Sequence, residues 1–106
     1  MILQDRHKQL LLNIATEHLP SEVVLVMYGS RADGTAHDAS DLDLALKTPN
    51  NQPIDIDVFV EFTEAVRHSN IPFLVQIFDY ARLPVSFHEA IDEQGIVLNN
   101  NAFGLH

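Results

Sequence analysis

The spacing of apolar residues in the first half of the chain predicts one helix and two strands. From Leu3 to Leu19 the apolar positions recur at helical spacing and gather on one broad face. The run from Val23 to Tyr28 is apolar, rich in β-branched residues and too short for a helix, which is typical of a buried strand. Residues Leu42 to Leu46 alternate between apolar and polar, so they predict a second strand. The polar segment 29–40 between the strands predicts a loop with at most one helical turn.

The stretch from Ile54 to Ser69, which follows a Pro- and Asn-rich turn, fits two patterns. Its apolar residues alternate as in a strand, but a second subset recurs at helical spacing. The glutamates, alanine and arginine in it favour a helix without deciding the matter. Phe73 to Phe78 then predicts a third strand.

The last part of the chain predicts a short helix and a short closing strand. The helix should run from Ser86 to Gln94, with Ser86 as its N-cap, Glu89 completing a capping box and Gly95 ending it. The closing strand would span Ile96 to Leu98. The order helix, strand, strand, helix, strand, helix predicts an α+β fold with a small mixed sheet and helices packed on one face.

Size and composition narrow the class of protein. The 106 residues are enough for a single domain, 1–106, with one modest core. The formal net charge of −9 argues against direct binding to nucleic acid, because such a surface repels a phosphate backbone. The chain contains no cysteine, which excludes disulfides and thiolate metal sites and favours a cytoplasmic location. Its longest apolar run is too short to cross a membrane.

Two short segments carry the candidate chemistry. Asp41 and Asp43 share one face of the second predicted strand, with their α-carbons about 6–7 Å apart at a rise of roughly 3.3 Å per residue. Carboxylates at this spacing can converge on one Mg²⁺ ion, which also takes water and phosphate oxygens as ligands. Gly29 and Ser30 follow the first strand directly and offer backbone amides and a hydroxyl to phosphate. Taken alone, each segment also fits an ordinary strand or turn.

The two segments together resemble the signature of the polymerase-β-type nucleotidyltransferases. Gly29-Ser30, ten intervening residues, and then Asp41-Leu42-Asp43-Leu44 stand in a strand-loop-strand context. The chain is similar in length and element order to the minimal nucleotidyltransferase (MNT) domains of that superfamily. The resemblance implies that 54–69 is a helix, that Asp41 and Asp43 are the catalytic metal ligands, and that Gly29, Ser30 and Arg31 contact the nucleotide phosphates.

The resemblance also implies a function and a partner. MNT proteins commonly pair with helical HEPN ribonuclease toxins, as antitoxins that transfer AMP from ATP to a tyrosine of the toxin. The expected cofactor is Mg²⁺, the expected substrate is ATP, and the expected assembly is a hetero-oligomer. Two other functions stay open: a non-catalytic module of the same fold that neutralises its partner by occlusion, and the nucleotide-binding half of a split small-molecule nucleotidyltransferase.

The third carboxylate of the family is missing from its expected place. The family usually carries it on the late strand, at the position that Gln76 occupies here, and glutamine cannot take up a proton. Asp79 is a second possible third site position, but strand alternation points it to the other face unless the strand bulges. For Arg31, a phosphate contact and an ion pair with Asp33 or Asp38 are both open.

Overall fold

A four-stranded mixed sheet forms the centre of the molecule. The computed structural model describes residues 3–37 and 39–99. The spatial order of the strands is β3-β2-β1-β4, with β2 and β3 parallel and the other neighbours antiparallel. The strands are β1 (Val24–Tyr28), β2 (Leu42–Lys47), β3 (Val75–Asp79) and β4 (Ile96–Val97). The mixed sheet and the α+β class are confirmed, as are the three main strands and the closing strand.

Strand alternation divides the sheet into two different faces. Leu42, Leu44 and Leu46 point to one face and are almost completely buried there. Ala45 points to the other face and packs in a second, smaller cluster with Val26. The sheet therefore separates a large core from a small one. Every second residue of β2, counted from Ala45, faces the side of the small core.

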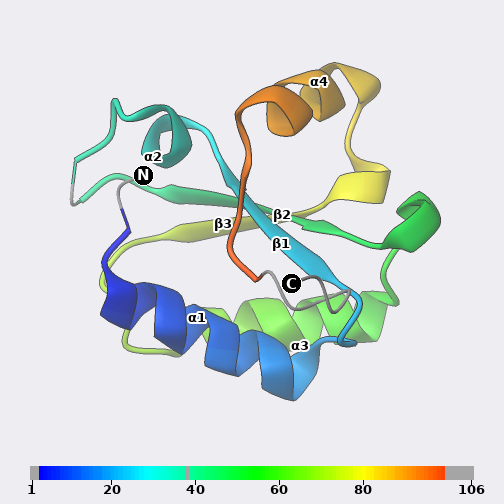
Figure 1. Cartoon of the computed structure of the whole chain (residues 1–106). Coiled ribbons are helices and arrows are strands. Elements are labelled where there is room, and N and C mark those ends of the chain that lie inside the picture. The colour runs from blue at the N-terminus through cyan, green and yellow to red at the C-terminus, as the bar shows by residue number, and fades with distance from the viewer. Residues whose placement is uncertain (1–2, 38, 100–106) are drawn as a thin grey trace.

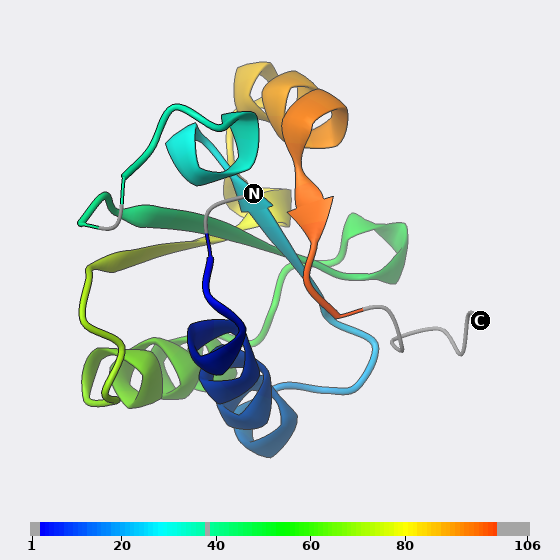
Figure 2. The ribbon, with the colours of Figure 1, turned by 60° about the vertical axis from the view of Figure 1, so that its left-hand side comes forward.

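Two helices cover the large core. Figures 1 and 2 both show α1 (Asp5–His18) and α3 (Ile56–Arg67) side by side along one face of the sheet. α3 resolves the ambiguity of its segment in favour of a helix. Phe62 and Val66, four residues apart, are buried, so the helical spacing decides which apolar residues enter the core.

The start of α3 shows how the helix is fixed. The side chain of Asp55 accepts hydrogen bonds from the backbone amides of Asp57 and Val58, at 3.0 and 3.3 Å, and so caps the helix. Ile56 and Val60, which a strand would bury together with Phe62, are 57% and 49% exposed. Capping and packing thus agree on the same helix.

The fourth helix corrects two expectations. α4 (Val85–Gln94) lies on the face opposite to α1 and α3, where its Ile91 packs with Val26 and Ala45, so the helices do not all pack on one face. The helix begins at Val85 after Pro84, with no side-chain cap, so Ser86 lies inside the first turn and is not the N-cap. Pro84 is the N-cap residue, with φ −57° and ψ 149°, and the helix begins directly after it. Gly95 ends the helix as expected.

The connections between strands contain short helical segments in addition to α3 and α4. The loop after β1 holds one helical turn, α2 (Ser30–Asp33), as the sequence allows. The turn after β2 contains a 3-10 helix, η1 (Pro49–Asn51), and a second one, η2 (Tyr80–Arg82), follows β3. α2 and α4 stand above the same face of the sheet, at different places along it (Figure 1). That face, beside α2, carries the candidate site.

Candidate active site

Asp41 and Asp43 stand at the start of β2 on the face away from the large core. The neighbouring leucine, Leu42, is 1% exposed and anchors the strand in that core. Asp43 is half-buried and Asp41 is exposed. Burial of the leucines therefore fixes the direction of both carboxylates, as the alternation predicts.

The backbone at Gly29 lies directly against the carboxylate of Asp43. Antiparallel pairing places Tyr28, the last residue of β1, opposite Asp43. Gly29 follows with a φ of 77°, in the left-handed region. A Cβ at this position would collide with the Oδ2 atom of Asp43. The positive φ therefore favours glycine here, and any larger residue would also displace the carboxylate of Asp43.

The turn after Gly29 brings Ser30 into the same region. Ser30 is the first residue of α2, and the carbonyl of Gly29 accepts hydrogen bonds from the amides of Ala32 and Asp33. The Ser30 carbonyl in turn accepts from three later amides, so the loop is held by its own backbone. The structure thus brings together Gly29, Ser30 and Asp43, three of the residues that the sequence singles out.

The negative charges of the two aspartates act on their neighbours. Partial burial and the nearby charge of Asp41 together raise the pKa of Asp43 above its ordinary value. Burial and the carboxylate of Asp43 raise the pKa of Tyr28 to about 12. A bound cation would relieve this repulsion, and carboxylate oxygens are ligands that Mg²⁺ prefers. Within residues 3–37 and 39–99, no group of three or more ligating side chains could hold a metal ion, so the ion would need further oxygens from substrate or water.

Gln76 completes the polar part of this face. The parallel pairing of β2 with β3 places Gln76 beside Asp43. Its side-chain Nε2 donates a hydrogen bond of 3.1 Å to Oδ2 of Asp41. Gln76 therefore stands where the alternation of β3 predicts, in direct contact with one of the two carboxylates.

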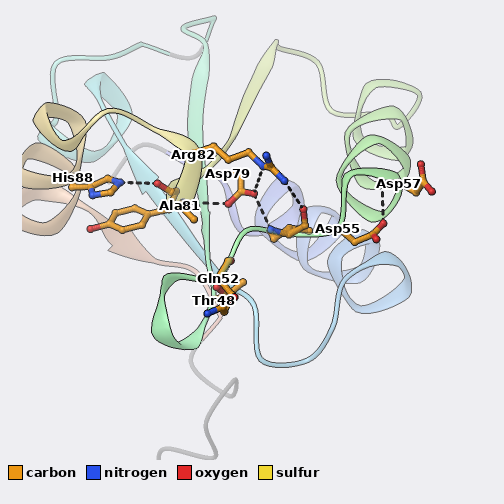
Figure 3. A network of polar contacts seen from close by, with 10 residues as sticks. Thr48, Gln52, Asp55, Asp57, Asp79, Ala81, Arg82 and His88 are labelled. Carbon is orange, nitrogen blue, oxygen red and sulfur yellow. Dashed lines mark hydrogen bonds and ion pairs between the residues drawn. The ribbon is translucent and has the colours of Figure 1, made fainter.

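Asp79 lies elsewhere. It pairs with Leu46 at the far end of β2, has the parity of the large-core face and is 6% exposed. Its carboxylate accepts hydrogen bonds from the amides of Ile54 and Ala81 and from Nε of Arg82, at 2.9, 3.2 and 3.2 Å (Figure 3). The strand does not bulge to bring this carboxylate to Asp41 and Asp43. Asp79 instead ties the segment before α3 to the segment after β3.

Arg31 is buried in the loop, at 2% exposure. Its Nε and Nη2 atoms donate to the carbonyl oxygen of Ser40 at 3.0 and 2.8 Å, and its guanidinium lies 4.0 Å from the ring centre of Phe73. Of the two expected ion-pair partners, Asp33 accepts hydrogen bonds from Thr35, and Asp38 lies outside the described residues. Arg31 thus links the loop after Gly29 to the residue just before Asp41.

Three residues near the site are not singled out by the sequence analysis. The rings of Tyr28 and Phe78 lie 6.4 Å apart, and strand pairing places both on the face of Asp43 and Gln76. Phe73 supports Arg31 from the segment before β3. The sequence indicates the position of Phe78, because strand alternation places it on the same face as Gln76. No local sequence pattern indicates the Arg31–Phe73 contact, since the two residues are far apart in the chain.

Comparison with known proteins identifies the family. Residues 10–102 match the family described as polymerase beta, nucleotidyltransferase. The chain belongs to this family. It is 30% identical over 82 residues to the probable protein adenylyltransferase MntA of Haemophilus influenzae, a match that covers 77% of this chain and 70% of that protein. The recognition of a nucleotidyltransferase domain from Gly29-Ser30 and Asp41-Leu42-Asp43 is thereby confirmed.

Solved structures confirm the fold of this nucleotidyltransferase domain. A toxin-antitoxin crystal structure with AMP-PNP superimposes with a TM-score of 0.70, at 19% identity, over 87% of this chain and 72% of the other. A mutant of the toxin-antitoxin MntA-HpeT superimposes with a TM-score of 0.68, at 15% identity, over 87% of this chain and 71% of the other. In that mutant two aspartates, two positions apart, are replaced by glutamate.

In the described part of the chain, no helix combines the length and the apolar character needed to cross a membrane.

Proposed function

We propose that this protein is an antitoxin that transfers AMP from ATP to a tyrosine hydroxyl of a partner HEPN-type ribonuclease toxin. The observation that carries the proposal is the contact of Gly29, which opens the Gly29-Ser30 turn, with Asp43 of the Asp41–Asp43 pair, at one end of the central strands β1 and β2. The relative MntA, named as a probable protein adenylyltransferase, supports the reaction, and the toxin-antitoxin structures support the kind of partner.

The residues of the site fit a nucleotide that arrives with Mg²⁺. Asp41 and Asp43 would hold the ion, since they are two neighbouring carboxylates; partial burial and the nearby charge of Asp41 raise the pKa of Asp43. The ion supplies positive charge to the phosphate oxygens when it is bound. The Gly29 turn lets the backbone approach the nucleotide closely, and the Ser30 hydroxyl is a donor for phosphate oxygen. Arg31 keeps the turn in place through the Ser40 carbonyl.

The reaction itself is a substitution at the α-phosphorus of ATP. The tyrosine oxygen of the partner forms a bond to that phosphorus, the bond to the bridging oxygen of the β-phosphate breaks, and pyrophosphate leaves with the electron pair. The phenolic proton must be lost in the same process. Gln76 cannot accept that proton, so the chain lacks a base at the position that carries a carboxylate in the family.

Gln76 has a measurable consequence for this proposal. General-base assistance contributes typically ~10²–10⁴-fold to a rate. We therefore expect slow transfer in the wild type and faster transfer in Gln76→Asp. If the wild type transfers rapidly and Gln76→Asp changes nothing, Gln76 does not limit the reaction.

The second candidate function is neutralisation by occlusion. Gln76 favours it, because a site without the third carboxylate can keep the fold and still fail in transfer. The net charge of −9 favours it as well, since an acidic surface complements a basic ribonuclease. In this case the partner would be inhibited without any covalent change.

One experiment separates the two functions. The protein is incubated with its cognate toxin, ATP and Mg²⁺, the intact mass of the toxin is followed over time, and the modified peptide is sequenced. A gain of one AMP on a tyrosine, absent in the Asp41→Asn/Asp43→Asn variant, supports the transferase. Inhibition of the toxin's ribonuclease activity without a mass change, retained in that variant, supports occlusion instead.

A further inference from the structure

Gln76 contacts the site in a way that bears on how many metal ions it can hold. Its amide nitrogen lies 3.1 Å from Oδ2 of Asp41, although its partner in the strand register is Asp43. The side chain therefore reaches diagonally across the two strands to the first carboxylate. The N–H group is the positive end of the amide dipole, and it points at the carboxylate oxygen.

This contact places a donor where a second cation would otherwise lie. An ion shared between Asp41 and residue 76 would have to stand between their two polar ends, the space that the hydrogen bond now spans. Two-metal sites of phosphoryl-transfer enzymes hold their ions about 3.5–4 Å apart, and a carboxylate shared between two such ions offsets the repulsion between them. Here one side offers an N–H group, which repels a cation and already interacts with one oxygen of Asp41.

Asp41 keeps the capacity to bind one ion. A carboxylate has two oxygens and about four acceptor directions, so a single N–H bond leaves most of them available. Asp43 stands on the same face, against the Gly29 turn, and within the described residues no third acidic or histidine side chain joins the pair in a metal-binding group. The pair together suits a single Mg²⁺ ion that completes its shell with phosphate oxygens and water.

We infer that Gln76 is a positioning residue that orients Asp41 and limits this site to one divalent ion per bound nucleotide. The inference rests on the proposed function, since it assumes that Asp41 and Asp43 bind a nucleotide with its metal. The amide of Gln76 holds Asp41 in place, as a second cation would, but it supplies no charge to the substrate. This accounts for a site that binds nucleotide and transfers AMP slowly.

Counting bound metal ions tests the inference. Mn²⁺ replaces Mg²⁺ as the probe, the protein is saturated with AMP-PNP, and free Mn²⁺ is measured by electron paramagnetic resonance during titration. We expect one bound Mn²⁺ per nucleotide complex in the wild type and two in Gln76→Asp. Gln52→Asp adds the same charge at an exposed glutamine beyond the far end of β2 and should leave the count at one.

A second variant keeps the test independent of the folding of Gln76→Asp. Gln76→Leu removes the hydrogen bond and adds no charge, so the count should stay at one while the affinity for Mn²⁺ falls several-fold, because Asp41 loses its orientation. A merely structural role for Gln76 would change the thermal stability but neither the count nor the affinity.

The outcomes distinguish this inference from the proposed function. Two Mn²⁺ ions in the wild-type complex would overturn the single-ion inference and leave the proposed function standing. An unchanged count of one in a folded Gln76→Asp would also overturn it. AMP-PNP that binds equally well without any divalent ion, or does not bind, would overturn the proposed function and with it the single-ion inference.

Discussion

Two ends of the same pair of strands carry buried or half-buried aspartates, and these aspartates have opposite surroundings. At one end, partial burial and the nearby carboxylate of Asp41 raise the pKa of Asp43. At the other end, Asp79 is almost fully buried and accepts hydrogen bonds from two backbone amides and from Arg82 (Figure 3).

The difference shows how a structural carboxylate is told from a ligand-binding one. Burial of a charge is tolerated when donors satisfy it, and such a group ties the fold together. Like charges held together cost stability, and an evolved protein keeps them where a ligand offsets that cost. By this criterion Asp79 belongs to the scaffold, and the Asp41–Asp43 pair belongs to the site.

The largest effect should come from removing both charges of the site. The Asp41→Asn/Asp43→Asn variant keeps the shape of both side chains but loses the two charges that we propose as the metal ligands. We expect Mg²⁺-dependent ATP binding to disappear in isothermal titration calorimetry, with the circular dichroism spectrum unchanged. An unchanged affinity for Mg·ATP would show that the ion binds somewhere else.

Removing the carboxylate of Asp79 should lower the stability of the protein and leave nucleotide binding unchanged. Asp79→Ala leaves the Ile54 and Ala81 amides and Arg82 without their acceptor, so the free energy of unfolding should fall by about 2–4 kcal/mol. Urea denaturation measures the loss. The affinity for Mg·ATP, measured at a temperature where the variant is folded, should stay at the wild-type value. Loss of nucleotide binding in a folded variant would show that Asp79 takes part in nucleotide binding.

A smaller effect should come from the phosphate side of the site. Ser30→Ala removes one hydroxyl donor, and loss of one hydrogen bond to a charged group weakens binding by about 1.5–3 kcal/mol. Adenosine is the control ligand, because it has the same base and sugar and no phosphate. Calorimetry in which ATP and adenosine lose affinity equally would contradict the phosphate contact.

The smallest effect concerns the pH dependence of stability. Since the folded-state pKa of Asp43 lies above its ordinary value, the folded protein holds this proton more tightly than the unfolded chain does. The contribution of Asp43 to the free energy of unfolding should therefore fall as the pH rises from the ordinary carboxyl pKa through the raised one, and then level off.

A comparison of the wild type with Asp43→Asn isolates this contribution. In urea denaturation across the acidic pH range, the free energy of unfolding of the variant should rise relative to that of the wild type as the pH rises. The reverse trend, in which the stability of the variant rises relative to that of the wild type as the pH falls, would mean that the fold stabilises the ionised carboxylate of Asp43.

Local patterns in the sequence were sufficient for most elements and for the direction of the site carboxylates. Alternation along β2 and β3 correctly placed Asp43 and Gln76 on one face, because parity is a property of the strand itself. The end of α4 at Gly95 is likewise set by a local signal. The patterns left open whether the segment 54–69 is a strand or a helix. Packing decides for the helix, since the tertiary fold buries Phe62 and Val66.

The remaining features depend on contacts between distant segments. The face on which α4 packs follows from the docking of Ile91 on Val26 and Ala45, which no periodicity within the helix reveals. Arg31 finds its partners at Ser40 and Phe73, and the Gln76–Asp41 hydrogen bond requires the parallel register of two strands. Ser86 fits the cap pattern, yet Pro84 starts the helix earlier.

The central claim, that nucleotide and metal bind at the Gly29–Asp43 end of the sheet and not at Asp79, can be tested in one measurement. The backbone amide spectrum of the ¹⁵N-labelled protein is recorded with AMP-PNP and small amounts of Mn²⁺, whose unpaired electrons broaden nearby resonances. We predict the strongest broadening at Gly29, Ser30, Asp43 and Gln76, with much weaker broadening at Ala81 and Ile54. Broadening centred on Ala81 and Ile54, or none at Gly29 and Asp43, would contradict the account.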